Sequence, residues 1–130
     1  MKSIIVDANV ILRYLLKDNE NFFMESKNLF DKALKNDVEI IIKQVILAKV
    51  VYVLEKVYQI EKNEISETLT ELLSLKGIKA DDKQTLIKSL QIYKEKNMDF
   101  ADAILCALSD KYLIKTFDKK LNNCIQSKIY

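Results

Sequence analysis

Short runs of β-branched residues alternate with longer amphipathic stretches along this chain, and this alternation constrains its fold more than any other feature. Strand-like runs cover residues 3–6, 38–42 and 113–117, and a shorter run at 78–80 suits a sheet edge. Residues 3–6 lack an alternation of apolar with polar residues, which is typical of a buried central strand. Strands separated by helices predict a mostly parallel sheet joined by right-handed crossovers.

Helical periodicity fills the intervals between these runs. Asn63 suits a helix N-cap, Asp81 or Asp82 suits the next one, and Gly77 lies where a left-handed residue ends a helix. We expect helices over 9–17, 21–35, 44–58, 63–75, 82–96 and 100–112, and a last strand stub at 128–130. The pattern predicts an α/β fold, a three-layer α/β/α sandwich with a mostly parallel central sheet. The length of 130 residues fits a single domain over residues 1–130.

The composition excludes several kinds of active site. The chain has no His and one glycine, Gly77. Ser–His–Asp triads, Cys–His pairs, His general bases and imidazole metal sites are therefore ruled out, and so is a Gly-rich phosphate loop. Catalysis by this chain would have to rely mainly on carboxylates, with or without a hard cation.

Cysteine use and hydropathy predict a cytoplasmic protein. Cys106 and Cys124 lack CxxC spacing, and we expect two buried free thiols, which suits a reducing compartment. No signal-peptide pattern is visible before Asp7. The longest nearly apolar run, residues 45–54, is too short to cross a membrane and carries Lys49 in its middle.

The net charge of +2 is unevenly distributed. Residues 111–130 contain five lysines and one acid, a net charge of +4, and the remainder carries −2. A basic C-terminal end suits a polyanionic partner, and an ordinary solvated lysine face explains it as well.

Isolated charges inside apolar runs mark a candidate site. Asp7, Lys49 and Asp102 are each the single charge of such a run, and side chains of this kind are rarely buried without a partner. Asp99 precedes Asp102 by three residues, so the two share one helix face. Asp7 and Asp118 each follow a predicted strand, and the carboxyl ends of parallel strands form the usual site in such sheets. These four acids therefore form a candidate cluster.

A cluster of carboxylates needs a positive partner. Two carboxylates about 4 Å apart repel by roughly 4 kcal/mol at an effective dielectric near 20. A bound Mg²⁺ or Mn²⁺ would suit a ligand set made of oxygens alone, and such sites commonly hydrolyse phosphodiesters. Structural roles stay open at this point: Asp7 as a helix cap, Asp102 as a cap or a partner of Lys49, and Asp118 as a turn residue.

Three segments of the chain, in their order and spacing, resemble the PIN-domain ribonucleases, and more narrowly the VapC-type toxins of toxin–antitoxin pairs. The segments are Ile5-Val6-Asp7-Ala8-Asn9-Val10-Ile11-Leu12-Arg13-Tyr14-Leu15, Asp99-Phe100-Ala101-Asp102-Ala103-Ile104-Leu105 and Thr116-Phe117-Asp118-Lys119-Lys120-Leu121. The resemblance covers essentially the whole chain. It implies an endoribonuclease dependent on Mg²⁺ or Mn²⁺, usually a homodimer, held inactive by a small antitoxin protein.

Roles transfer from the family by position. Asp7, Asp102 and Asp118 match catalytic, metal-binding acids, and Asp99 matches a supporting metal-binding acid. Asn9 and Thr116 match polar residues that line the pocket; as ordinary residues they would be a helix-start cap and a strand hydroxyl.

Lys49 departs from the family, which has Glu at this position. The exchange removes one acid from the site and adds an ammonium, so the resemblance implies a weakened or inactive enzyme. Glu55 follows six residues later, about 240° around an ideal helix, and cannot simply replace that Glu.

Other functions compete with the nuclease interpretation. One is a non-catalytic PIN-like module that binds RNA or an antitoxin. A receiver-like phosphoacceptor domain is disfavoured because Ala8 follows Asp7, where that fold requires a second acid. We also expect part of the early aromatic surface to form a dimer face or an antitoxin groove, with core packing as the alternative. These aromatic residues are Tyr14, Phe22, Phe23 and Phe30.

Overall fold

A three-stranded parallel sheet lies at the centre of the computed structural model, which describes residues 1–127. Its strands are β1 (Lys2–Ile5), β2 (Val38–Ile42) and β3 (Ile78–Ala80), in the order β1-β2-β3. Ile4 of β1 lies opposite Ile40 of β2, and Ile40 lies opposite Ile78 of β3. The parallel sheet and its short strand at residues 78–80 are confirmed.

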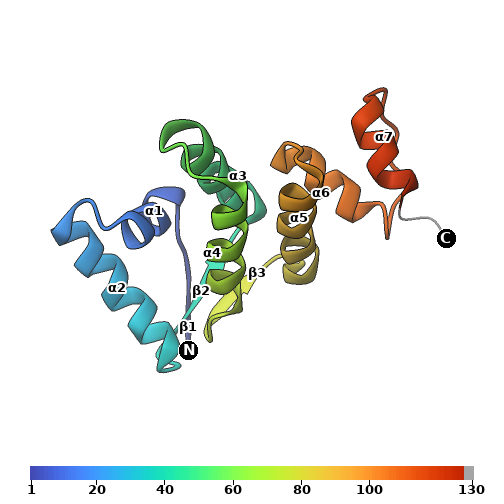
Figure 1. Ribbon diagram of the computed structural model, residues 1–130. Helices are drawn as coiled ribbons and strands as arrows, with labels where there is room; N and C mark the ends of the chain where they lie inside the picture. Colours follow the sequence, from blue (N-terminus) through green and yellow to red (C-terminus); the bar gives the residue numbers. More distant parts are fainter. Residues whose placement is uncertain (128–130) are drawn as a thin grey trace.

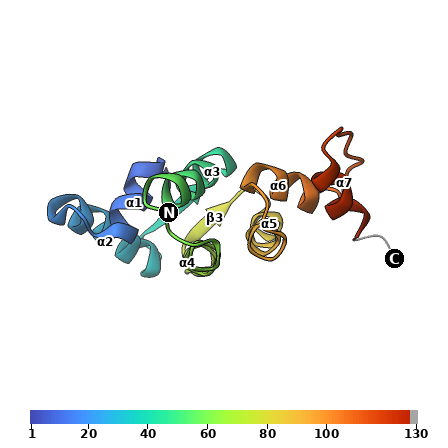
Figure 2. The same ribbon diagram turned by 45° about the horizontal axis from the view of Figure 1, so that its top comes forward.

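Helices surround this sheet, as the alternating pattern predicts. Figure 2 shows α1 and α3 on one side of the strands and α4 on the other, which confirms the three-layer α/β/α fold. A π-helical turn, η1, continues α3 in place of the last part of the expected long helix. The helical elements are α1 (Ala8–Leu16), α2 (Glu20–Leu34), α3 (Gln44–Tyr52), η1 (Val53–Val57), α4 (Lys62–Ser74), α5 (Lys83–Lys96), α6 (Phe100–Leu108) and α7 (Lys119–Gln126).

Side-chain caps start several of these helices. Asp7 accepts a hydrogen bond from the Val10 amide at 3.2 Å, and Asp82 accepts one from the Thr85 amide at 3.4 Å. Each bond satisfies an amide that has no partner within its own helix. The expected cap at Asn63 is wrong, because α4 already begins at Lys62, after Glu61.

The core forms where the helices meet β2. Ile40 and Ile42 are fully buried, together with Phe30 of α2 and Tyr93 of α5. The Tyr14 ring stacks on Phe30 with centroids 4.3 Å apart. Burying side chains of this size stabilises the fold by about 1.5–3 kcal/mol each. Core packing therefore accounts for Tyr14 and Phe30 among the early aromatic residues, whereas Phe22 is exposed.

The C-terminal part departs from the expected sheet. Residues 113–117 form no strand, and α6 ends at Leu108 instead of residue 112. Figure 1 shows α7 at one end of the molecule and α2 at the other, with β1 on the α2 side. The expected stub at 128–130 lies outside the described residues.

β1 is consequently not the buried central strand that the sequence predicts. Within residues 1–127 it pairs with β2 alone, and three of its four residues are exposed. Residues 3–6 have the apolar composition of a central strand because Ile4 and Val6 pack on the core, although they do so from one side only. The central position belongs to β2.

A disulfide between Cys106 of α6 and Cys124 of α7 overturns the expectation of free thiols. Both side chains are buried, and the two Cα atoms are 6.2 Å apart. A spacing of 18 residues between two cysteines gives no signal of pairing in the sequence, since only the contact between α6 and α7 brings them together. No helix among the described residues is long and apolar enough to span a membrane.

Gly77→Ala should destabilise the fold. The φ angle of Gly77 is +84°, and a Cβ at this position would lie 2.4 Å from the Ala33 carbonyl oxygen. Together, backbone strain and the clash should lower the free energy of unfolding by about 1–3 kcal/mol. Urea denaturation measures this loss, with the exposed neighbour Lys76→Ala as the control that should change little. Equal stability of the two variants would contradict the prediction.

Candidate active site

Three of the predicted acids gather where α6 begins. Asp99 is the N-cap residue of α6, Asp102 lies in its first turn, and Asp118 is the N-cap residue of α7. Burial raises the pKa of Asp102, and the negative charges of Asp118 and Asp99 raise it further. Lys120 partly offsets them. The structure therefore brings these three carboxylates within electrostatic reach of one another.

Asp7 and Asn9 lie apart from these acids. Both line a cavity of about 230 Å³ between α1 and α2, together with Arg13, Glu25 and Ser26. Asp7 is the N-cap of α1, so its structural role is visible. The predicted site is thus divided into a group beside β1 and a group beside α6.

Thr116 belongs to the α6 group. Its hydroxyl oxygen accepts a hydrogen bond from the Asp118 amide at 3.0 Å, and its carbonyl accepts one from the Asn122 side chain at 3.1 Å. The Asp118 carboxylate in turn accepts a bond from the Leu121 amide at 2.8 Å. These bonds fix the turn into α7 that carries Asp118.

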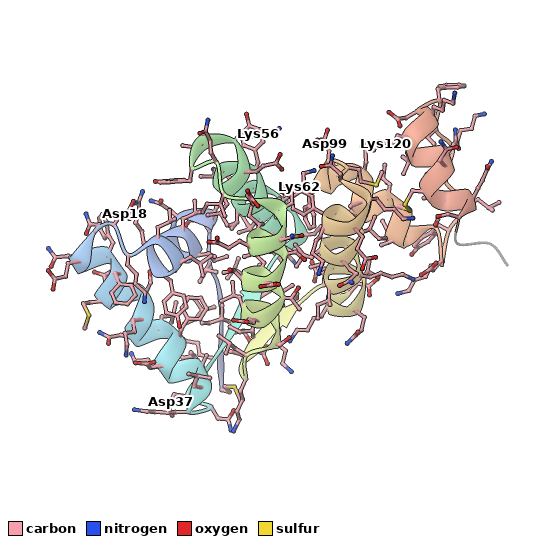
Figure 3. The ribbon with its side chains drawn as sticks, viewed as in Figure 1. Asp18, Asp37, Lys56, Lys62, Asp99 and Lys120 are labelled. Atoms are coloured by element: carbon pink, nitrogen blue, oxygen red, sulfur yellow. A yellow bond between two sulfur atoms is a disulfide. The ribbon has the colours of Figure 1, made fainter. Side chains whose placement is uncertain are left out.

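Lys49 is not a buried ammonium among the acids, which corrects that expectation. Its side chain is exposed on α3, between Leu47 and Val50, which face the core. The positive charges near the acids at the start of α6 come from two other lysines. Lys120 lies near Asp102, and Lys62 lies near Asp99. Figure 3 shows Lys62, Asp99 and Lys120 along the same side of the molecule.

A cleft of about 310 Å³ separates α3 and η1 from the start of α6. Glu55 and Asp99 are its acidic lining residues, and Ala48, Val51 and Tyr52 supply much of its apolar wall. Burial raises the pKa of Glu55, but hydrogen bonds from Tyr93 and Lys56 outweigh it and leave that pKa lowered. The Glu55 carboxylate accepts a hydrogen bond from the Tyr93 hydroxyl, with 2.5 Å between the two oxygen atoms. Glu55 is therefore held ionised at the edge of the cleft.

Lys62 lies close to the two acids of this cleft, whereas Lys56 is the lysine that lines it. Its ammonium lies 4.4 Å from the centre of the Tyr93 ring and donates a hydrogen bond to the Met98 carbonyl at 2.9 Å. Burial lowers the pKa of Lys62, while Glu55 and Asp99 oppose the shift.

Glu55, Lys62 and Tyr93 were not among the site residues predicted from the sequence, which named Glu55 only as unable to replace the family's Glu. A signal for Glu55 was present, because residues 48, 51, 52 and 55 have the i, i+3, i+4, i+7 spacing of one helix face. Lys62 and Tyr93 come from α4 and α5, and no sequence pattern connects those positions with α6.

The arrangement does not provide a metal site within one copy of the chain. Among residues 1–127, no three acidic, His or Cys side chains are grouped so that they could hold an ion. The donors are of the right chemical type, since carboxylates suit Mg²⁺ and Mn²⁺. Their positions do not fit, because Asp7 lines the cavity between α1 and α2, whereas Asp102 and Asp118 lie at the starts of α6 and α7.

Comparison with known proteins identifies the family. The PIN domain family matches residues 4–124, nearly the whole chain, and the chain therefore belongs to the PIN domain family. PIN domains are generally metal-dependent nucleases that act on nucleic acid. No curated protein and no solved structure matches the chain.

Asp102→Asn should stabilise the metal-free protein at neutral pH. The raised pKa means that the folded state favours the protonated carboxyl, so its stabilising effect is lost as the pH rises through the folded-state pKa. The neutral amide avoids this loss, and we expect a melting temperature up to about 3 °C higher at pH 7. The gain should vanish below about pH 4, where the unfolded-state carboxyl is also protonated. Thermal melts across pH measure it.

Glu67→Gln serves as the matched control, since Glu67 is an exposed acid on α4. It should leave the melting temperature nearly unchanged at each pH. A clearly lower melting temperature for Asp102→Asn would instead assign Asp102 a structural role.

Proposed function

We propose that this protein is an endoribonuclease of the VapC toxin type, dependent on Mg²⁺ or Mn²⁺ and weakened by Lys49. The crowding of Asp99, Asp102 and Asp118 at the start of α6, in a chain of the PIN family, is the observation that carries the proposal. Burial is the main cause of the raised pKa of Asp102, and the neighbouring carboxylates raise it further. A divalent cation would relieve the repulsion among these carboxylates. Asp7 is the further acid that this function requires.

Positive side chains around these acids suit an RNA backbone. Lys62 and Lys120 lie beside the acids, and Lys115 and Lys119 are exposed on either side of Asp118. Lysines bind phosphates through charge, independently of base sequence, and such binding weakens as salt increases. These residues would bind and orient the RNA strand beside the carboxylates.

The proposed partners are a small antitoxin and a second copy of the chain. Phe22 and Met24 of α2 are the aromatic and apolar side chains of the early helices that remain most exposed, at 53% and 47%. They are the candidates for an antitoxin contact. We place the activity in the cytoplasm, where burial of Cys106 and Cys124 would shield their disulfide from reductants.

A non-catalytic module that binds RNA or an antitoxin is the second candidate. The separation of Asp7 from Asp102 and the lysine at position 49 favour it. The two functions differ in one measurement: a binding module retains RNA without cutting it when Mg²⁺ or Mn²⁺ is added.

Lys49→Glu should switch on ribonuclease activity. The change removes a charge that repels divalent cations and supplies a carboxylate at the position where the family has Glu. Lys49→Gln should give an intermediate rate, since it removes the repulsion without adding a charged ligand. Cleavage of a mixed RNA pool with Mn²⁺, compared across the parent and both variants, measures the effect.

Lys32→Glu is the control, because it makes the same charge change at an exposed position of α2. It should leave cleavage at the parent level. If the parent and Lys49→Glu cut RNA equally, position 49 lies outside the metal-binding region and the proposed role of Lys49 is wrong.

A further inference from the structure

The outer edge of β1 is open in this structure. Within residues 1–127, β1 pairs with β2 alone, and 62% of Ile5 is exposed. An unpaired edge of this kind presents backbone amides and carbonyls that can accept another strand. Natural proteins usually protect such edges. An unprotected edge that carries an exposed isoleucine is therefore a candidate for pairing with another strand.

A segment with the properties of a strand is free at the other end of the molecule. Residues 113–117 read Leu-Ile-Lys-Thr-Phe, which is a strand-forming composition, yet they form no strand. Leu113 is fully exposed and Phe117 is 92% exposed. The total accessible surface, 8037 Å², is about 950 Å² larger than that of a typical compact monomer of 15.1 kDa.

The packing of α6 keeps this segment away from β1 of its own chain. α6 packs along α5 and also contacts α3, and the Cys106–Cys124 disulfide ties α7 to α6. Figure 1 shows α7 at the end of the molecule remote from β1. Pairing within one chain would require α6 to leave α5, whereas a second copy can supply the segment without this cost.

We propose that residues 113–117 of one copy add to the open edge of β1 of a second copy, in parallel orientation, and that the exchange is reciprocal. Two identical pairings then close a symmetric dimer. The parallel orientation continues that of β1, β2 and β3. Each surface covers the apolar side chains that the other leaves exposed.

This exchange also unites the divided acid site. Asp118 directly follows the segment and Asp7 closely follows β1, so parallel pairing brings both to the same edge of the sheet. Asp118 and Asp102 of one copy would thus join Asp7 of the other. This part of the inference rests on the proposed function, since it assigns the united acids to the metal site.

Sedimentation of the metal-free protein tests the exchange by itself. We expect a dimer for the parent and a folded monomer for the double variant Leu113→Asp/Phe117→Asp, whose side chains are exposed within one copy. The double variant Val45→Asp/Val57→Asp, which places the same two charges on exposed apolar residues of α3 and η1, should remain dimeric. A parent that stays monomeric at its highest soluble concentration, or a double variant that still dimerises, would overturn the proposal.

Mixing two variants tests the shared site. In the Lys49→Glu background, an Asp7→Asn chain is refolded together with an Asp118→Asn chain, and Mn²⁺ binding is followed by electron paramagnetic resonance. In an exchanged dimer, one site of each mixed pair receives both intact acids, so binding should rise to about a quarter of the parent capacity after random mixing. Each variant alone should bind little.

The outcomes separate the two ideas. A stable dimer without any gain on mixing would overturn the sharing of Asp7 and Asp118 between copies. A dimer of the Lys49→Glu chain that binds no Mn²⁺ would overturn the proposed metal site, while the sedimentation result would still support the strand exchange.

Discussion

The packing of α6 against α5 determines the arrangement of the rest of this molecule. This contact directs the chain after Leu108 away from the sheet, and the Cys106–Cys124 disulfide then fixes α7 to the same helix. Two features follow from it: β1 becomes an edge strand, and residues 113–117 pair with no strand in the described part of the chain. The position of α6 thus goes together with the separation of Asp7 from Asp102 and Asp118 within one copy of the chain.

Electrostatics explains why the acids depend on this arrangement. Asp102 already has a raised pKa with Asp99 and Asp118 as neighbours, so a further carboxylate from Asp7 would increase the repulsion. Lys62 and Lys120 offset part of this charge, and both are held by hydrogen bonds to backbone carbonyls. A chain that keeps Asp7 at a distance can therefore fold without a cation. Bringing Asp7 into the group would make a cation necessary, which links assembly of the site to metal binding.

The cleft beside Asp99 shows a second balance between burial and charge. Glu55 is partly buried, yet it stays ionised because Tyr93 and Lys56 donate hydrogen bonds to it. Lys62 contacts the same Tyr93 ring, so one aromatic side chain supports an anion at its hydroxyl and a cation on its face. This network connects α4, α5 and η1 to the start of α6 and holds Asp99 at the mouth of the cleft.

The sequence by itself determined the local structure and the family. Helix periodicity and the strand runs at β1, β2 and β3 are properties of neighbouring residues, and the sequence predicted them. The caps at Asp7 and Asp82 were among the alternatives that the sequence left open. The grouping of Asp99 with Asp102 also follows from helix spacing. Tertiary structure alone decided the rest: the exposure of Lys49, the disulfide, the edge position of β1 and the separation of Asp7 from Asp118. These features depend on long-range packing, above all on the position of α6. The strand preference of residues 113–117 is a local property, so it does not reveal whether the open edge of β1 lies close enough for pairing.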